Sequence, residues 1–126
     1  MGSGIDLAYS KQELELHGVP AQIFSGTKTA TGNTGETPIY VGHFKEASFF
    51  LNVTAKSGTT PTLGCKIQTK GEDGQWYDLV TFTQATDVTH EMKEKANCLG
   101  EYIRLLYTIG GTTPSFTFTC YGYFKK

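Results

Sequence analysis

The chain has 126 residues, of which 13% are aromatic and 18% charged, and its formal net charge is −1. A chain of this length buries roughly two-thirds of its unfolded surface, so it can fold as one independent domain. Binding to phosphates requires a concentrated basic surface, so the charge balance argues against nucleic acid as a partner. The apolar runs are too short to span a bilayer, and no signal segment opens the chain, so we expect no membrane association.

The beginning of the chain is polar, and residues 1–18 are predicted to form an extended N-terminal arm. Residues 19–126 are predicted to form a single domain. Its first strand is expected at Val19–Phe24, because β-branched and aromatic residues favour strands. Residues 25–38 are rich in Gly, Thr, Asn and Ser and predict a long loop, which ends at a short strand, Ile39–Val41.

The middle of the chain predicts a β-hairpin. Residues 47–55 and 62–68 each carry apolar side chains at every second position, which is the period of a strand. These positions are Phe49, Leu51, Val53 and Ala55 in the first segment and Leu63, Cys65 and Ile67 in the second. The segment between them, residues 56–61, contains Gly58 and Pro61 and predicts the turn.

Two further strands are expected after a second turn. Gly71–Gly74 predicts that turn, since glycine supplies the positive φ angles that a reversal requires. Residues 76–82 carry apolar groups on both faces, and we expect Trp76 to be the centre of the core. Residues 84–92 predict a more polar strand.

The last third of the chain predicts a second hairpin, between residues 103–109 and 116–120. Its turn, Gly111–Ser115, nearly duplicates the sequence of Gly58–Thr62, and in each the proline stands where a strand begins. The apolar positions that flank the two turns differ in register by one residue. We therefore interpret the repeat as recurrent turn chemistry and not as a gene duplication.

The pattern of about eight short strands without helical periodicity predicts an all-β fold. We expect an antiparallel β-sandwich, either jelly-roll or immunoglobulin-like, with an extended N-terminal arm. Its exposed sheet edges must be covered by the arm, by the long loop or by a partner chain, because uncovered edges promote aggregation.

The three cysteines, Cys65, Cys98 and Cys120, stand at wide spacing without a paired C-x-x-C element. This spacing fits neither a disulfide scaffold nor a zinc module, so we expect reduced, packed thiols. A disulfide between two of them, or across a subunit boundary, is the alternative.

No motif for catalysis is present in the sequence. The three histidines, His17, His43 and His90, lack metal-ligand spacing, and no serine stands in a G-x-S-x-G sequence. No glycine-rich phosphate loop precedes a helix. We therefore expect a protein that is not an enzyme and has no catalytic, cofactor-binding or metal-binding residues.

The acidic residues near the middle of the chain are interpreted as solvated surface groups. They are Asp73, Asp78, Asp87, Glu91 and Glu94. The turn Gly71–Gly74 is superficially similar to a calcium loop, but it lacks the repeated Asp or Asn positions and the distal bidentate Glu.

Aromatic residues near the C-terminus allow two interpretations. Tyr121, Tyr123 and Phe124 could form a stacking platform for carbohydrate, or they could pack in the core or in a subunit interface. We favour packing and keep carbohydrate binding as the alternative.

Strand and turn sequences over the last two-thirds of the chain, from residue 47 to about residue 123, carry a family resemblance. They are Leu51–Ala55, Ser57–Leu63, Lys66–Gln68, Asp73–Asp78, Thr81–Gln84, Tyr102–Leu105 and Gly110–Phe116. In these elements the chain resembles small virion proteins of tailed bacteriophages. The shared elements are strand and turn sequences and contain no active site. They therefore indicate the fold more specifically than the function.

The resemblance implies a structural subunit of the virion, assembled in the cytoplasm of the bacterial host. We expect a capsid decoration or cement protein on the outer head surface, where repeated weak contacts add up to strong retention. Its implied partners are the major capsid protein or other virion subunits, and further copies of itself in a homo-oligomer such as a trimer. A neck, tail or fibre-attachment subunit is the alternative within this class.

Overall fold

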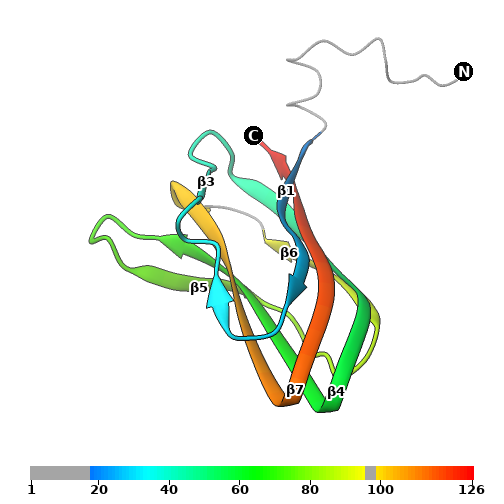
Figure 1. Cartoon of the computed structure of the whole chain (residues 1–126). Coiled ribbons are helices and arrows are strands. Elements are labelled where there is room, and N and C mark those ends of the chain that lie inside the picture. Colours follow the sequence, from blue (N-terminus) through cyan, green and yellow to red (C-terminus); the bar gives the residue numbers. More distant parts are fainter. Residues whose placement is uncertain (1–17, 96–98) are drawn as a thin grey trace, which may run out of the picture.

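Long antiparallel strands dominate the computed structural model of the protein, which describes residues 18–95 and 99–126. The strands are β1 (Val19–Lys28), β2 (Gly32–Asn33), β3 (Ile39–Tyr40), β4 (Glu46–Lys70), β5 (Trp76–Thr81), β6 (Thr89–Lys95) and β7 (Tyr102–Lys125) (Figure 1). The predicted all-β, antiparallel, sandwich-like class is confirmed. The arm predicted for residues 1–18 lies, except for Gly18, outside the described residues.

Strands β4 and β7 form the frame of the fold. They pair with each other from Glu46 opposite Lys125 at one end to Thr69 opposite Ile103 at the other. Both strands bend sharply at the same end of the molecule, so that each has two limbs (Figure 1). The bends divide the paired ribbon into two parts that enclose the core between them.

Two layers result from this bend. Layer A contains β6, residues 46–56 of β4, residues 115–125 of β7, and β1, in that order. Layer B contains β5, residues 62–70 of β4 and residues 102–110 of β7, with β2 and β3 on the far side of β7. The inward-facing side chains of both layers belong to one cluster of buried residues.

The two hairpins predicted from sequence are wrong. Residues 47–55 do not pair with residues 62–68; they pair with β7 on one side and β6 on the other. Likewise, residues 103–109 and 116–120 are two limbs of β7, and each limb pairs with β4. The predicted turns are therefore corners that carry each strand from one layer into the other.

The two corners face each other, with Thr59 opposite Thr112. Each begins with a glycine at positive φ, 107° at Gly58 and 113° at Gly111. Each also holds a threonine in the left-handed region, Thr60 at 45° and Thr113 at 47°, whose hydroxyl donates a 2.8 Å hydrogen bond to the preceding carbonyl. The repeated turn sequence thus builds one paired corner.

A bulge explains why the apolar registers around the two corners differ by one residue. The pairing of β4 with β7 shifts between Val53 and Ala55, so Thr54 has no partner of its own. An extra residue in one strand reverses which side chains face inward beyond it. Val53 is accordingly the last buried side chain of β4 before its corner, and burial resumes after the corner at Pro61 and Leu63.

The core is built around phenylalanines of layer A and not around Trp76. Phe49, Phe116 and Phe118 are fully buried, and Phe118 packs against Phe24 and Tyr107 with ring centroids 4.7 and 5.9 Å apart. Trp76 is half-buried on the outer face of layer B, outside the buried cluster. The prediction for Trp76 is wrong because a bulge at Leu79 separates its register from that of the inward-facing Val80 and Phe82.

Other element boundaries also differ from the prediction. The predicted loop 25–38 contains the end of β1 and the short strand β2. The polar strand predicted at residues 84–92 is displaced toward the C-terminus and forms β6. These segments lack a clean apolar alternation because β1 and β6 are sheet edges, each paired on one side among the described residues.

Cys65 and Cys120 are free, buried thiols, as predicted; Cys98 lies outside the described residues. Burial raises the pKa of the Cys65 thiol to about 12. Burial also raises the pKa of Cys120, and the neighbouring Cys65 adds to the effect. Both groups therefore stay protonated in the folded protein at pH values that ionise ordinary thiols.

A Cys98→Ser variant is expected to leave both remaining thiols unreactive toward a chromogenic disulfide reagent until the protein unfolds. Its free energy of unfolding should fall as the pH rises above 9.0, the ordinary thiol pKa, because the unfolded thiols release protons that the folded ones retain. Thiol absorbance with and without denaturant, and denaturation at several pH values, measure the two effects. Rapid labelling of the native variant would contradict this burial.

Candidate functional site

The histidines within the described residues lie apart from one another on the surface. His43 is exposed and contacts the ring of Tyr40 edge to face, at a centroid distance of 5.3 Å. His90 is exposed on β6, and His17 lies outside the described residues. In residues 18–95 and 99–126, no group of three His, Cys, Asp or Glu side chains could hold a metal ion.

The turn at Gly71–Gly74 uses its own carboxylate internally. Asp73 accepts a short hydrogen bond from the Tyr77 hydroxyl and a 2.9 Å bond from the Gln75 amide. These two bonds lower the pKa of Asp73, and the bond to Asp73 raises the pKa of Tyr77. Both carboxylate oxygens of Asp73 are thereby engaged within the turn. Asp73 thus stabilises the turn itself, and this role does not require the residue spacing of a calcium loop.

The other acidic residues predicted as surface groups lie on or between the strands. The Val88 amide donates a 2.7 Å hydrogen bond to Asp87. Glu91 accepts bonds of 2.8 and 2.9 Å from the amide and hydroxyl of Thr83. Burial by itself would raise the pKa of Glu91, but these bonds together with Lys93 lower it.

An apolar patch occupies the outer face of layer A. We call it the layer A patch, and it consists of Phe50, Met92, Tyr121 and Tyr123. Phe50 lies between Met92 and Tyr121 in the sheet register. Met92 is 50% exposed and Tyr123 45% exposed, whereas Phe124, the third predicted platform residue, points into the core at 2%. The structure therefore divides the predicted aromatic platform between two faces.

The rings of the layer A patch are oriented unfavourably for sugar stacking. Phe50 and Tyr121 stack on each other, with centroids 4.8 Å apart and planes at 8°. The Tyr123 ring lies against Gly18, where an added Cβ would be 2.7 Å from its Cδ1 atom. Phe50 and Tyr121 therefore each have one ring face covered by the other, which leaves less free aromatic face for a stacked sugar.

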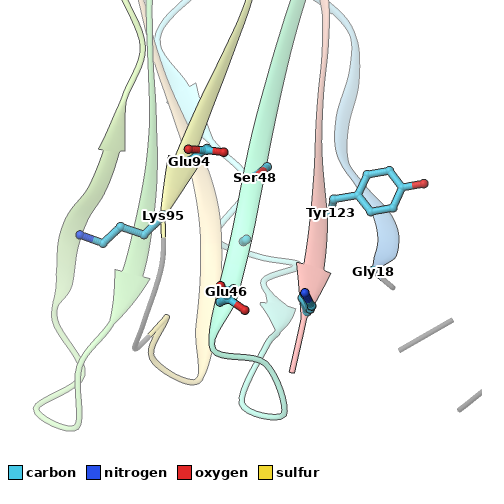
Figure 2. Close-up of a pocket in the computed structure, with 8 residues that line it drawn as sticks. Gly18, Glu46, Ser48, Glu94, Lys95 and Tyr123 are labelled. Atoms are coloured by element: carbon cyan, nitrogen blue, oxygen red, sulfur yellow. The ribbon is translucent and has the colours of Figure 1, made fainter. Parts of the chain in front are cut away.

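A groove opens beside this patch, where β1 begins (Figure 2). Tyr123 projects toward the Gly18 end of β1, while Glu94 and Ser48 lie on the neighbouring strands. The groove has a volume of about 310 Å³ and is lined by Gly18, Glu46, Ala47, Ser48, Glu94, Lys95, Tyr123 and Lys125. Its charges are mixed, so it offers polar contacts next to the apolar ones of the patch.

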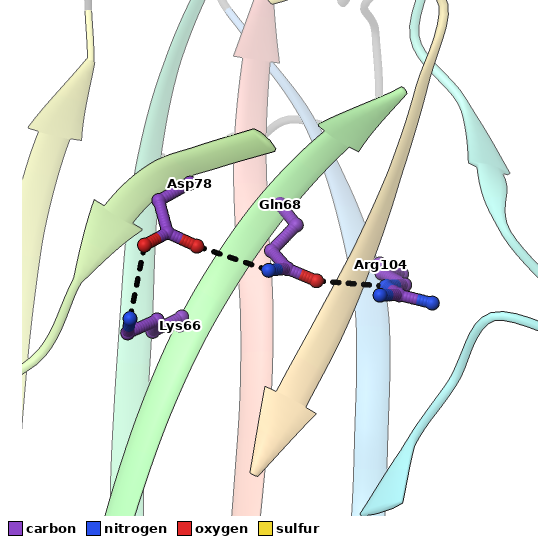
Figure 3. A network of polar contacts seen from close by, with 4 residues as sticks. All are labelled: Lys66, Gln68, Asp78 and Arg104. Atoms are coloured by element: carbon purple, nitrogen blue, oxygen red, sulfur yellow. Dashed lines mark hydrogen bonds and ion pairs between the residues drawn. The ribbon is translucent and has the colours of Figure 1, made fainter. Parts of the chain in front are cut away.

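A polar network crosses the outer face of layer B (Figure 3). Gln68 donates a 2.9 Å hydrogen bond to Asp78, which also pairs with Lys66 at 2.9 Å. Arg104 in turn donates from Nε to the Gln68 side-chain oxygen at 2.9 Å. The bonds from Gln68 and then Lys66 lower the pKa of Asp78, whereas burial lowers the pKa of Arg104.

Sequence reasoning missed this network. The alternation of residues 62–68 does place Lys66 and Gln68 on the outward face, which is the available signal. Their partners come from β5 and β7, and the pairing of Gln68 with both Asp78 and Arg104 depends on strand order and on the bulge at Leu79. Neither feature can be read from local periodicity.

The searches for related proteins do not indicate a function, so the function is inferred from the surfaces described above. No protein-family model matches the chain, and a search of curated proteins finds no match. Within the described part of the chain, no helix is long and apolar enough to cross a membrane.

Proposed function

We propose that this protein is a non-enzymatic structural subunit of a tailed-bacteriophage virion, and specifically a capsid decoration or cement protein. The observation that carries the proposal is the layer A patch, a cross-strand set in which Met92 and Tyr123 are exposed and Phe50 and Tyr121 half-buried, beside a groove. Aromatic residues and methionine are enriched in protein interfaces. The resemblance of residues 47–123 to small virion proteins supports the same class.

The edges of layer A strengthen the case for a bound protein. Within the described residues, β6 and β1 each leave one side without a strand partner. An edge strand can accept a strand from another chain through backbone hydrogen bonds. Many copies bound to a symmetric shell would convert weak contacts of this kind into firm retention.

Co-sedimentation with undecorated shells, assembled from the major capsid protein encoded in the same genome, tests the proposal. The wild-type chain should pellet with the shells, and the double variant Met92→Ser, Tyr123→Ser should bind at least about tenfold more weakly, because interface aromatic groups dominate binding energy. The double variant Val88→Ser, Tyr77→Ser is the matched control, since those side chains are 56% and 48% exposed outside the patch. It should bind within about twofold of wild type.

Light scattering during size-exclusion chromatography tests the accompanying proposal of self-association. An oligomer that becomes a monomer when residues 1–17 are deleted would support a subunit that laces onto its neighbours. A monomer indifferent to the deletion, absent from shells and retained by polysaccharide, would replace the proposal with a carbohydrate-binding module. Binding to purified necks or tails and not to heads would instead support a neck or tail subunit.

A further inference from the structure

Arg104 on the outer face of layer B is held in place on two sides. Its guanidinium carbon lies 4.5 Å from the centroid of the Trp76 ring, within the range of a cation–π contact. Its Nε donates to Gln68, whose amide orientation is set by the bond from its nitrogen to Asp78. The side chain is half-buried, so the position of the charged group is restricted by its neighbours.

The terminal nitrogens of this guanidinium have no hydrogen-bond partner among the described residues, although Nη1 lies near Gly35, where an added Cβ would be 2.9 Å from it. An arginine carries five N–H donors, and among the described residues Arg104 forms one side-chain hydrogen bond, through Nε. The ion pairs within residues 18–95 and 99–126 join Lys66 to Asp78 and Lys93 to Glu91, so Arg104 has no carboxylate partner there. Figure 3 shows one of its terminal nitrogens pointing away from Gln68.

Such an arrangement favours a bidentate anion. Partial burial removes part of the hydration of the guanidinium, which costs free energy when no counter-charge lies nearby. A bound anion would offset that cost. The planar fork of arginine matches the two oxygens of a carboxylate. Because Trp76 and Gln68 already fix the guanidinium, little further side-chain freedom would be lost on binding.

We propose that Arg104 is the centre of a binding site for a carboxylate side chain of a partner protein. Trp76 supplies apolar contact beside it. Tyr102 precedes Arg104 by two residues on β7 and packs against Tyr40, which is 47% exposed, at a centroid distance of 5.4 Å. Asp78 engages Lys66, and Lys70 Nζ lies 6.0 Å from the centroid of the same Trp76 ring, so the site offers one arginine fork with one lysine beside it and not a basic track. One fork suits a single carboxylate better than a polyphosphate chain, which requires several cations.

The site lies on layer B and does not depend on the function proposed for layer A. A capped tetra-glutamate peptide is the probe, and tryptophan fluorescence is the readout, since Trp76 is the one tryptophan of the chain. The peptide should quench or shift this fluorescence in a saturable manner that weakens with added salt. The neutral tetra-glutamine peptide should have no effect.

Two variants identify the group responsible. Arg104→Lys keeps the charge but loses the fork and the Nε bond, and it should bind the acidic peptide at least about tenfold more weakly. Lys56→Gln removes one positive charge near the corner and should bind as wild type does. Circular dichroism verifies that each variant folds, and nitrogen-detected NMR of the Arg104 Nε group in the wild type gives a readout that needs no variant.

Three outcomes would overturn the proposal. In the first, the peptide perturbs neither Trp76 nor Arg104. In the second, Arg104→Lys binds the peptide as tightly as wild type. In the third, inorganic phosphate competes with or exceeds the peptide at equal concentration, which would assign the fork to phosphate. Shell binding by layer A is measured separately, so either proposal can fail while the other stands.

Discussion

The Phe118→Ala variant is expected to lose about 3 to 5 kcal/mol of unfolding free energy, the usual cost of removing a buried phenyl ring. Phe118 is fully buried in layer A and touches Phe24 of β1 and Tyr107 of layer B. Removing its ring opens a cavity between the layers that the surrounding strands cannot close, because both frame strands are fixed by pairing along their length. Urea denaturation followed by circular dichroism measures the loss.

Tyr123→Ala is the matched control for this prediction. Tyr123 stands in the same limb of β7 but faces outward and is 45% exposed. Its removal should cost about 1 kcal/mol or less, as is usual for surface positions. Equal losses in the two variants would contradict the assignment of inward and outward faces in β7.

Gly58→Ala and Gly111→Ala are each expected to cost about 2 to 4 kcal/mol of unfolding free energy, through strain at positive φ and contact with fixed backbone atoms. A Cβ at Gly58 would lie 2.6 Å from the carbonyl oxygen of Thr113. A Cβ at Gly111 would lie 2.8 Å from the carbonyl oxygen of Thr60. Neither contact can be relieved by rotating a side chain, so the paired corner must open.

Gly74→Ala separates conformational strain from contact at the corner. Gly74 has a φ of 82°, and no atom lies within 4 Å of the position of its Cβ. It should cost about 1 kcal/mol, from backbone strain alone. A corner variant that costs no more than Gly74→Ala would show that the two turns do not press on each other.

The double variant Gly58→Ala, Gly111→Ala tests whether the two corners form one unit. Once the first alanine has separated the corners, the second meets less resistance, so the combined loss should be smaller than the sum of the single losses. Strict additivity in the same denaturation experiment would mean that each turn bends independently. It would also leave the near-identity of the two sequences without a structural explanation.

The two outer faces of the molecule differ in chemistry, which is the basis for proposing different partners for them. Layer A presents stacked aromatic rings and Met92, whereas layer B presents the network from Lys66 to Arg104. An apolar patch gains binding energy by burying area, and a held guanidinium adds selectivity for one anion. Under the two proposals, the protein contacts two different surfaces.

The strand periodicity of the sequence was sufficient to predict the all-β class and most of the core. The alternating positions of Phe49, Leu51 and Val53, like those of Phe116 and Phe118, are buried as predicted. These predictions succeed because the side-chain period of a strand is a local property of the backbone. The burial of Cys65 and Cys120 follows from the same alternation.

The pairing of the strands was decided by the tertiary structure. A turn sequence such as Gly58–Pro61 reverses a strand into a hairpin or bends it into a second layer, and both outcomes bury the same alternating side chains. Which neighbour receives the backbone hydrogen bonds depends on residues far away in sequence, here the matching corner at Gly111–Pro114. For the same reason, sequence reasoning named Tyr121 and Tyr123 of the layer A patch but missed Phe50, Met92 and the Arg104 network, because the registers of β4, β5, β6 and β7 bring these residues together.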